Sequence, residues 1–371
     1  MTIENIYLQG NFAPVEEELT AFDLEVIGTI PAELEGRYLR NGPNPVSIER
    51  PEQHHWFAGN GMVHGVRLRG GRAEWYRNRY VRSQAVCEAL GEQAGGSQPT
   101  SSPNTNVAAW AGRTLALVEG GGAPVEMGYE LDTLGARPFG AVPPGGFTAH
   151  PKFDPLTGEW HAMCYAWAQW LDHIKYVVVG ADGEVSKAVD IPLPGMVMLH
   201  DMALTRNYAV VFDLPVTVDM SFVAARRFPY RWNPDYTPRI GLLPRTSTDA
   251  ADIIWCDIDP CYGYGAGVGE GFAPGDLYKH DMDKGTVDVH RLGAGRGSGE
   301  PDFVPRERPV SEDDGWLMSY VYDAVTDSSE LLILDALDVT ADPLARVILP
   351  QRVPFGFHGN WISDHAVQTT T

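Results

Sequence analysis

The chain has 371 residues, of which 44% are hydrophobic, so it can bury a sizeable core and is not a disordered polymer. Its 28 Lys and Arg residues are outnumbered by 49 Asp and Glu residues, and the net charge of −21 repels nucleic-acid backbones and anionic lipid headgroups. Composition and charge therefore exclude nucleic-acid binding.

Neither a secretory signal nor a membrane span is predicted. The N-terminus has no basic region followed by an apolar one, and nowhere does the chain contain a run of about 18 apolar residues. The cysteines are too few and too scattered for a disulfide framework, and we expect them to be reduced and mostly buried: Cys87, Cys164, Cys256 and Cys261. A cytoplasmic location is the expectation.

Short apolar runs separated by Gly- and Asp-rich turns recur along the chain, and long helical periodicity is absent. Residues 176–179 lead through a turn at 180–183 into residues 185–193. The same pattern recurs at 277–292 and at 331–349. Repeated hairpins predict an all-β fold, and their spacing leaves a sandwich, a barrel and a propeller open.

Two segments are predicted to be loops. Residues 91–105 are rich in Gly, Ser, Pro and Asn, and residues 262–275 read YGYGAGVGEGFAPG, with six glycines in fourteen residues. The second segment lies between strand-like stretches, where another strand would be expected. No change of composition marks a domain boundary, so residues 1–371 are predicted to form one domain.

Three ordered blocks near the N-terminus carry a specific resemblance. They are PAELEGRYLRNGPNP (31–45), HWFAGNGMVHGVRL (55–68) and YRNRYVR (76–82). With later blocks at 148–155, 199–215, 299–306 and 353–361, the sequence resembles the carotenoid cleavage oxygenases. That family includes carotenoid and apocarotenoid oxygenases, lignostilbene dioxygenases and the retinoid isomerase of the eye. The resemblance implies a seven-bladed β-propeller under a dome of loops and helices.

The resemblance also implies one Fe²⁺ per chain, held by four histidines from four blades with no carboxylate ligand. Imidazole suits iron, and open coordination positions admit O₂. His150 in TAHP, His200 in LHD and His358 in FHGNW match three of the four ligands. A lone histidine is most often structural, but three in the family order, each within its motif, favour the ligand interpretation.

Two glutamates match residues that orient the ligands in the family. Glu119 in LALVEGG and Glu300 in GEPDFVP are each expected to accept a hydrogen bond from a ligand histidine, which fixes its tautomer and direction. As isolated residues they would be read as surface acids.

The third ligand block is absent. In the family a Phe-His-x-x-Asn-Ala block follows a Pro-Cys-Tyr, whereas here residues 260–262 read PCY and lead directly into the glycine-rich segment. The middle glutamate of the family falls in the same gap. About a hundred residues are missing near 262–275, which is roughly two blades at about 40–45 residues per blade. We therefore predict an incomplete propeller.

The resemblance implies a dioxygenase that splits a conjugated C=C bond with O₂ into two carbonyl products. Lignostilbene dioxygenases contact the substrate phenol with a Tyr, which Tyr80 matches, and with a Lys, whose place Val118 takes. Valine cannot bind a phenol, which favours a carotenoid or apocarotenoid, with a stilbenoid as the alternative. Together with Tyr80 and Val118, the aromatic residues Phe57 and Phe357 are predicted to line the substrate tunnel.

Three functional alternatives remain open from the sequence. The chain is an active dioxygenase, an inactive truncated propeller or, with little support, a metal-dependent propeller hydrolase. Because one histidine is missing, we expect weaker iron binding than in a complete relative and little or no cleavage. An apolar polyene and O₂ are the expected partners, with weak peripheral membrane contact for substrate uptake. The sequence leaves the oligomeric state open.

Overall fold

The computed structural model describes residues 5–93, 99–120, 122–137, 139, 147–165, 170, 172–224, 229–257, 275–281, 286–311 and 313–364. These residues are mostly β-strands, with two short α-helices, α1 (Gln84–Leu90) and α2 (Met220–Ala224). Four 3₁₀ turns occur at η1 (Ile6–Leu8), η2 (Gly10–Phe12), η3 (Pro51–Gln53) and η4 (Ala250–Asp252). Among the described helices, none is long and apolar enough to cross a membrane.

Two sheets join the ends of the chain. The first has the order β1 (Thr20–Phe22), β5 (Arg72–Tyr80), β4 (Gly61–Arg69), β3 (Gly36–Pro43) and β27 (Gly359–Ser363). The second has the order β2 (Val26–Gly28), β26 (Ala345–Ile348), β25 (Ser328–Asp335), β24 (Gly315–Asp323) and β22 (Arg296–Ser298), with β23 (Asp302–Pro305) also on β24. In each sheet an N-terminal strand thus pairs with a C-terminal strand, and these hydrogen bonds hold the two ends of the chain together.

The remaining sheets follow one another along the chain. One consists of β6 (Asn106–Trp110), β7 (Arg113–Leu117), β8 (Val125–Met127) and β9 (Thr133–Ala136). The next consists of β10 (Lys152–Phe153), β11 (Trp160–Cys164), β12 (His173–Val179) and β13 (Val185–Pro192). A third consists of β14 (Met202–Leu204), β15 (Tyr208–Asp213), β18 (Arg239–Pro244) and β19 (Ile254–Asp257), and two hairpins are β16 (Val216–Val218) with β17 (Tyr230–Trp232) and β20 (Leu277–Asp281) with β21 (Thr286–His290).

The predicted hairpins are confirmed in this topology. Strands β12 and β13 pair around a turn in which Gly183 N–H donates to Gly180 C=O, and the β20–β21 and β25–β26 pairs occupy the other two predicted positions. Of the cysteines, Cys87 and Cys164 are buried and Cys256 is exposed; all three are free, and Cys261 lies outside the described residues.

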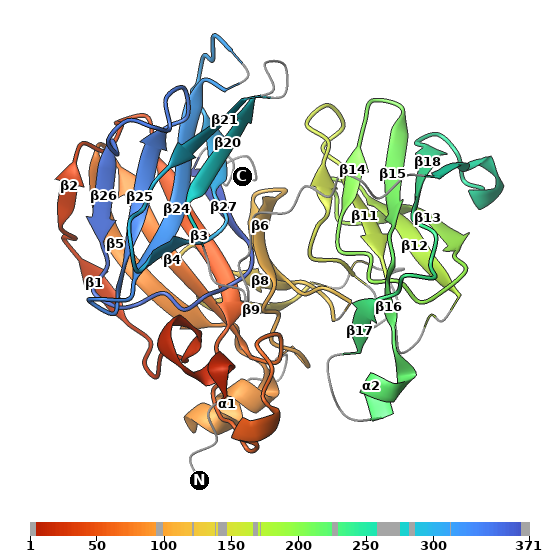
Figure 1. The fold of residues 1–371 in the computed structure, drawn as a ribbon, viewed down its shortest axis with the longest axis horizontal. Helices are drawn as coiled ribbons and strands as arrows, with labels where there is room; N and C mark the ends of the chain where they lie inside the picture. Colours follow the sequence, from red (N-terminus) through yellow and green to blue (C-terminus); the bar gives the residue numbers. More distant parts are fainter. Residues whose placement is uncertain are drawn as a thin grey trace.

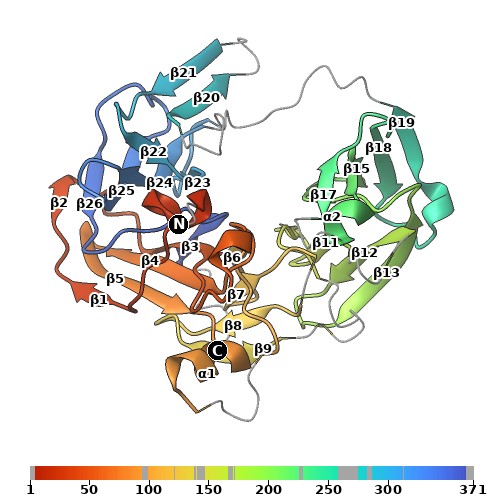
Figure 2. The ribbon, with the colours of Figure 1, turned by 60° about the horizontal axis from the view of Figure 1, so that its bottom comes forward.

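The sheets stand around a common centre like the blades of a propeller, and together they form an arc (Figures 1 and 2). Strands at the inner ends of neighbouring sheets contact one another: β27 meets β6 and β23, and β10 meets β14. The N-terminal 3₁₀ turns, α1, α2 and the β16–β17 hairpin lie at one end of the sheets (Figure 1), as expected for a covering dome. The fold is therefore the predicted all-β propeller type.

Apolar packing between neighbouring sheets stabilises the arc. Tyr176 and Ile191, on β12 and β13, are fully buried against Val211 and Leu243 of the next sheet. Burying side chains of this size removes about 1.5–3 kcal/mol of unfavourable hydration each. On the side where the two ends of the chain are joined, Trp316 and Tyr38 pack in the cluster between the first two sheets.

The arc has an open side between β19 and β20 (Figure 2), and the intervening residues 258–274 lie outside the described residues. Within the described part of the chain, no sheet stands between these strands. Ile254 on β19 is 53% exposed, and Tyr278 and Val287 on the β20–β21 hairpin are 46% and 49% exposed. Apolar sheet faces that a neighbouring blade would cover are thus left accessible. The predicted glycine-rich loop at 262–275 falls almost entirely in the undescribed segment.

Candidate metal centre and substrate cavity

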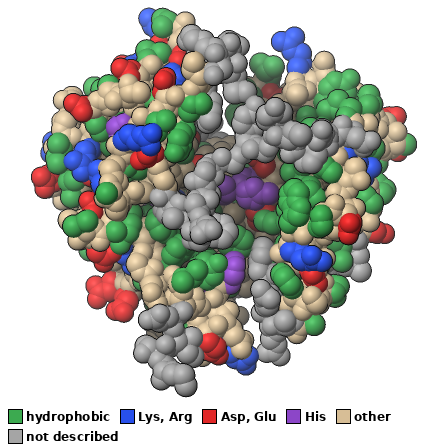
Figure 3. Space-filling view, viewed as in Figure 1, with side chains coloured by type: hydrophobic (Ala, Val, Ile, Leu, Met, Phe, Trp, Pro, Cys, Tyr) green, Lys and Arg blue, Asp and Glu red, His purple; other side chains and the backbone are tan. Residues whose placement is uncertain are grey.

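Three histidine side chains converge at the centre of the arc. Each lies on a loop leading into the inner strand of a sheet: His150 before β10, His200 before β14 and His358 before β27. One ligand atom of each lies within 4.8 Å of the others, and the ring centroids of His150 are 4.3 Å from those of His200 and His358. Figure 3 shows histidine side chains in the hollow between the two halves of the molecule. The structure brings the three predicted positions together.

Asn106, at the start of β6, connects two of the histidine loops. Its Nδ2 donates to the carbonyl oxygen of Ala149 (2.8 Å), next to His150, and its Oδ1 accepts from Asn360 Nδ2 (3.0 Å), two residues after His358. The bond to Ala149 is buried and the bond from Asn360 is partly buried, so breaking either would leave a polar group at least partly desolvated. The Asn106 amide therefore fixes the distance between the loops of His150 and His358.

An ion pair connects the third loop. Lys152 Nζ lies 2.7 Å from Asp201 Oδ1, which links the residues just after His150 and His200. Both side chains are about one-third exposed, so the pair contributes at most about 1 kcal/mol to stability. It matters because it holds two loops in register. The backbone of His358 is positioned separately, by an N–H bond of 3.1 Å to the carbonyl oxygen of Thr105.

Two of the three rings have their outer nitrogen bound to a carboxylate. His200 Nδ1 donates to Glu119 Oε2 (2.7 Å), and His358 Nδ1 donates to Glu300 Oε2 (2.6 Å). With the proton held on Nδ1, the lone pair of Nε2 is directed toward the centre. His150 is 9% exposed, and its Nε2 is buried with no hydrogen-bond partner in the described structure.

The charge states follow from these surroundings. Burial, followed by the positive charges that His358, His200 and Lys152 can carry, lowers the pKa of His150 to about 2, so this ring is neutral. Partial desolvation opposes protonation of His200, but the hydrogen bond and charge of Glu119 raise its pKa above the ordinary value. For Glu300, partial desolvation favours the neutral acid, but the hydrogen bond from His358 and nearby positive charge lower its pKa.

These residues fit a metal ion. The buried and unpartnered Nε2 of His150 costs free energy unless something binds it, and the rings of His200 and His358 are oriented to share the same partner. Three imidazole nitrogens suit iron, zinc, copper or nickel. No fourth histidine and no carboxylate joins this group among the described residues. The donor set found is three nitrogens.

A cavity of about 310 Å³ borders the histidines. His200, His358 and Glu119 form its polar wall, and the apolar wall contains Val118 and Met198. The full lining is Phe57, Asn104, Thr105, Val118, Glu119, Gly120, Tyr165, Met198, His200, Pro229, Tyr230, Phe357 and His358. A mostly apolar pocket beside a few convergent polar groups is typical of a small-molecule site.

The predicted tunnel residues do not all reach this cavity. Phe57, Val118 and Phe357 line it, and the rings of Phe57 and Phe357 meet edge to face with centroids 5.2 Å apart. Tyr80 does not line it. Tyr80 is 3% exposed, packs against Met62 and accepts a hydrogen bond from Asn44 Nδ2 (2.6 Å), so its hydroxyl is used inside the protein.

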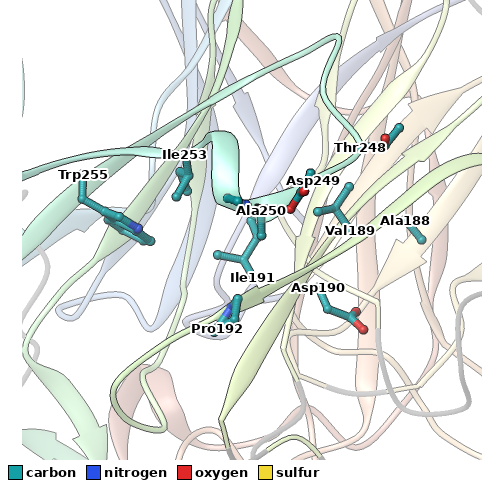
Figure 4. Close-up of a pocket in the computed structure, with 11 residues that line it drawn as sticks. Ala188, Val189, Asp190, Ile191, Pro192, Thr248, Asp249, Ala250, Ile253 and Trp255 are labelled. Carbon is teal, nitrogen blue, oxygen red and sulfur yellow. Dashed lines mark hydrogen bonds between the residues drawn. The ribbon is translucent and has the colours of Figure 1, made fainter.

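A larger cavity of about 610 Å³ lies elsewhere, between β13 and the segment around η4 (Figure 4). Its labelled side chains include Ile191, Pro192 and Trp255, and it contains no histidine. Of its two acids, Asp190 is paired with Lys175 and Asp249 accepts a hydrogen bond from the backbone N–H of Ala251. Of these two cavities, the smaller one borders the group of three metal-binding donors found among the described residues.

Sequence reasoning missed several residues that build the site. Asn106 and Thr105 stand in the run NTN, whose two asparagines signal side-chain-to-backbone bonding, and Tyr165 donates to Glu119 across the cavity wall. Arg40 in RNGPNP is buried beside Glu300. The sequence motifs that contain these residues can be recognised, but the residues they bond to lie on other sheets and cannot be predicted from the motifs.

Comparison with known proteins places this geometry in a family. The family model described as retinal pigment epithelial membrane protein matches residues 12–264 and 261–363. A carotenoid cleavage oxygenase of Mycobacterium tuberculosis (strain CDC 1551 / Oshkosh) is 37% identical, over 96% of this chain and 97% of the relative. A carotenoid 9,10(9′,10′)-cleavage dioxygenase of Crocus sativus is 27% identical, over 98% and 90%.

Solved structures share the fold. The lignostilbene dioxygenase of Pseudomonas brassicacearum superposes with a TM-score of 0.84 at 23% identity, covering 97% of this chain and 99% of that one. A variant of the Synechocystis apocarotenoid oxygenase superposes with a TM-score of 0.79 at 24% identity, covering 94% and 97%. The protein is a β-propeller with a candidate metal centre on its axis, and it belongs to the carotenoid cleavage oxygenase family.

The comparisons also bear on the predicted gap. The alignment with the mycobacterial relative runs over 493 positions, more than the 371 residues of this chain, so the relative has residues without a counterpart here. The two segments matched by the family model meet at 261–264, next to the sequence PCY. Both observations agree with an internal deletion relative to the family.

Proposed function

We propose that this chain holds one Fe²⁺ with His150, His200 and His358, and that it cleaves a conjugated C=C bond of a carotenoid or apocarotenoid with O₂. The observation that carries the proposal is the convergence of three imidazoles within 4.8 Å, beside an apolar cavity. Family membership supports the reaction class, because the relatives are carotenoid cleavage oxygenases.

The protein's own groups have separate tasks in this proposal. His150, neutral because it is buried, offers its Nε2, while Glu119 and Glu300 hold the Nδ1 protons of the other two rings. Iron, when bound, supplies the activation of O₂. The wall containing Phe57 and Phe357 excludes water and positions the alkene beside the histidines.

The cavity favours an apolar substrate. Val118 stands beside Glu119 on the wall and offers no hydrogen bond, whereas a phenolic stilbenoid would need a polar partner. The hydroxyl of Tyr165 also lines the cavity but is bonded to Glu119. A volume of about 310 Å³ accommodates the part of a polyene around one double bond. A stilbenoid remains the competing substrate class.

The test is an anaerobic Fe²⁺ titration followed by addition of O₂ and an apocarotenal. We expect one Fe²⁺ per chain and two carbonyl products, identified by mass spectrometry. Parallel reactions with a hydroxylated stilbene should be slower. Failure to bind Fe²⁺, or faster cleavage of the stilbene, would contradict the metal site or the substrate class respectively.

A second candidate is a metal-binding propeller with impaired catalysis. It is favoured by the three-histidine donor set and by the open side between β19 and β20. A missing donor leaves the metal less firmly fixed, and misplacement by about 1 Å can cost about 100-fold in rate. A turnover number on the order of 1 s⁻¹ or more would reject this candidate. Stoichiometric iron without products would support it.

For substrate uptake we propose weak contact with a lipid surface. Met220 on α2 and Trp232 on β17 are 61% and 58% exposed, and Pro229 and Tyr230 beside Trp232 line the cavity. Apolar and aromatic side chains of this kind insert at lipid interfaces. Trp232→Ser should reduce flotation with neutral phosphatidylcholine vesicles. Leu156→Ser, at a residue that is 88% exposed and remote in sequence, is the control and should leave flotation unchanged.

A further inference from the structure

One residue outside the predicted set is built into the metal centre through a carboxylate. Tyr165 follows β11, and its hydroxyl donates to Glu119 Oε1 at 2.5 Å. The other oxygen of the same carboxylate, Oε2, accepts from His200 Nδ1 at 2.7 Å. A phenol, a carboxylate and an imidazole are thus connected in one chain that ends at the candidate metal site.

The tyrosine is held firmly. It is 5% exposed and packs in the apolar cluster that contains Met163 and Tyr176, with its ring centroid 6.4 Å from that of Tyr230. Gly120, next to Glu119, has φ of +58°, and a Cβ there would lie 3.4 Å from the Tyr165 ring. The backbone next to Glu119 therefore lies beside this ring at ordinary van der Waals distance, in a left-handed conformation that favours glycine.

The hydroxyl can act only as a donor to Glu119. Burial, followed by the charge of Glu119, raises the pKa of Tyr165 well above its ordinary value, so the phenol stays protonated. A glutamate has several rotatable bonds, and a single contact with His200 would leave the carboxylate free to turn. Two bonds to its two oxygens fix its plane, which in turn fixes the tautomer and direction of His200.

His200 depends on this restraint more than its neighbours do. Its side chain is 50% exposed, whereas that of His358 is 21% exposed and His150 is 9% exposed as a residue. Less of its ring is confined by packing, so its orientation rests on the hydrogen bond to Glu119. We propose that Tyr165 is a positioning residue of the metal centre, acting through Glu119 on His200; this rests on the proposed metal site.

The experiment measures Co²⁺ affinity by visible absorption in the metal-free protein, which needs neither O₂ nor substrate. Tyr165→Phe keeps the ring and removes the donor, and we expect the affinity to fall about 3- to 10-fold. Tyr176→Phe is the matched control: it removes a buried phenol of the same sheet whose hydroxyl is bonded to His161 instead. Its Co²⁺ affinity should equal that of the wild type.

A double-mutant cycle separates positioning from a general structural effect. In a Glu119→Ala background, which removes the acceptor of both hydrogen bonds, Tyr165→Phe should have little further effect on Co²⁺ affinity, whereas in a Glu300→Gln background its full effect should remain. Tyr165→His restores a ring N–H donor and should recover part of the Co²⁺ affinity. It replaces Tyr165→Phe in the test if the Phe variant unfolds at too low a temperature. Equal loss in all backgrounds, or no loss, would overturn the positioning role alone. A wild-type chain that binds no Co²⁺ would overturn the metal centre as well.

Discussion

The two histidine–glutamate pairs of the centre use the same side chains in opposite surroundings. In the pair on the β14 side, His200 is 50% exposed and its partner Glu119 is 11% exposed. In the pair on the β27 side, His358 is 21% exposed and its partner Glu300 is 54% exposed. The hydrogen bonds have nearly equal lengths, 2.7 and 2.6 Å, so only the environment differs.

A third group completes each pair. Glu119 is bonded to the neutral phenol of Tyr165, whereas Glu300 lies near the buried guanidinium of Arg40, whose charge helps to lower the pKa of Glu300. Arg40 donates to the carbonyl oxygen of Gly356 and lies tightly against the backbone at residue 299. One carboxylate is therefore oriented by a directional bond and the other is held by a charge.

The exposed member of each pair belongs to a sheet that borders the open side of the arc. His200 precedes β14, in the sheet that ends with β19, and Glu300 precedes β23, in the sheet next to the β20–β21 hairpin. These are the sheets that border the open side, and they carry the exposed member of each pair. The local motifs of both pairs are intact, so the difference in exposure comes from the surrounding sheets.

Removing a ligand ring is expected to have the largest effect. His358→Ala should reduce Co²⁺ affinity by more than about 100-fold, which is the upper end of the effect known for residues that only hydrogen-bond to a metal ligand. His200→Ala should reduce the affinity less, because water can replace the ring at this more exposed position. Isothermal titration of the metal-free protein measures both. His161→Ala, at a buried histidine bonded to Tyr176, is the control. If all variants bound Co²⁺ as tightly as the wild type, His200 and His358 would not be metal ligands.

Neutralising the carboxylates should have an intermediate effect. Residues that hydrogen-bond to a metal ligand contribute about 10–100-fold to metal affinity. Glu119→Gln is expected to weaken Co²⁺ binding by about 100-fold, because Glu119 is mostly buried. Glu300→Gln is expected to weaken it by about 10-fold, because water can partly replace the exposed Glu300. The exposed Glu184→Gln should change nothing. A larger loss for Glu300 would show that the charge of Arg40 matters more than the bond from Tyr165.

The smallest effect is a pH dependence of stability that differs between the pairs. The folded pKa of His200 lies above its ordinary value of 6.5, so its contribution is fully present below pH 6.5 and is lost as pH rises through the folded pKa. The folded pKa of Glu300 lies below 4.5, so its contribution is present above pH 4.5 and is lost as pH falls through the folded pKa.

Urea unfolding of the metal-free protein at a series of pH values measures these slopes. Because His200 and Glu300 are about half exposed, each should contribute only about 0.2–1 kcal/mol. Glu119→Gln should remove the alkaline slope and Glu300→Gln the acid one. Variants that alter the opposite slope, or neither, would show that the pairs are not separate titrating units.

Local sequence carries much of this information. The hairpins at 176–193 and 277–292 were predictable because turn residues and apolar runs act between near neighbours. The histidines could be predicted because each stands in a motif, and the structure brings all three together. Tyr80 shows the limit: its motif predicted a place in the tunnel, yet Asn44, 36 residues away, holds its hydroxyl inside the protein.

The sequence by itself determined the β-rich class, because turn residues and apolar runs are local, and its motifs, through the resemblance they carry, predicted the three candidate histidines and the absence of a fourth ligand block. Tertiary structure alone decided that Asn106 connects two histidine loops, that Tyr165 bonds to Glu119 and that His200 is half exposed while Glu119 is mostly buried. These features depend on contacts between sheets that are 43 to 254 residues apart along the chain. Packing of whole sheets sets such distances, and no local pattern encodes them.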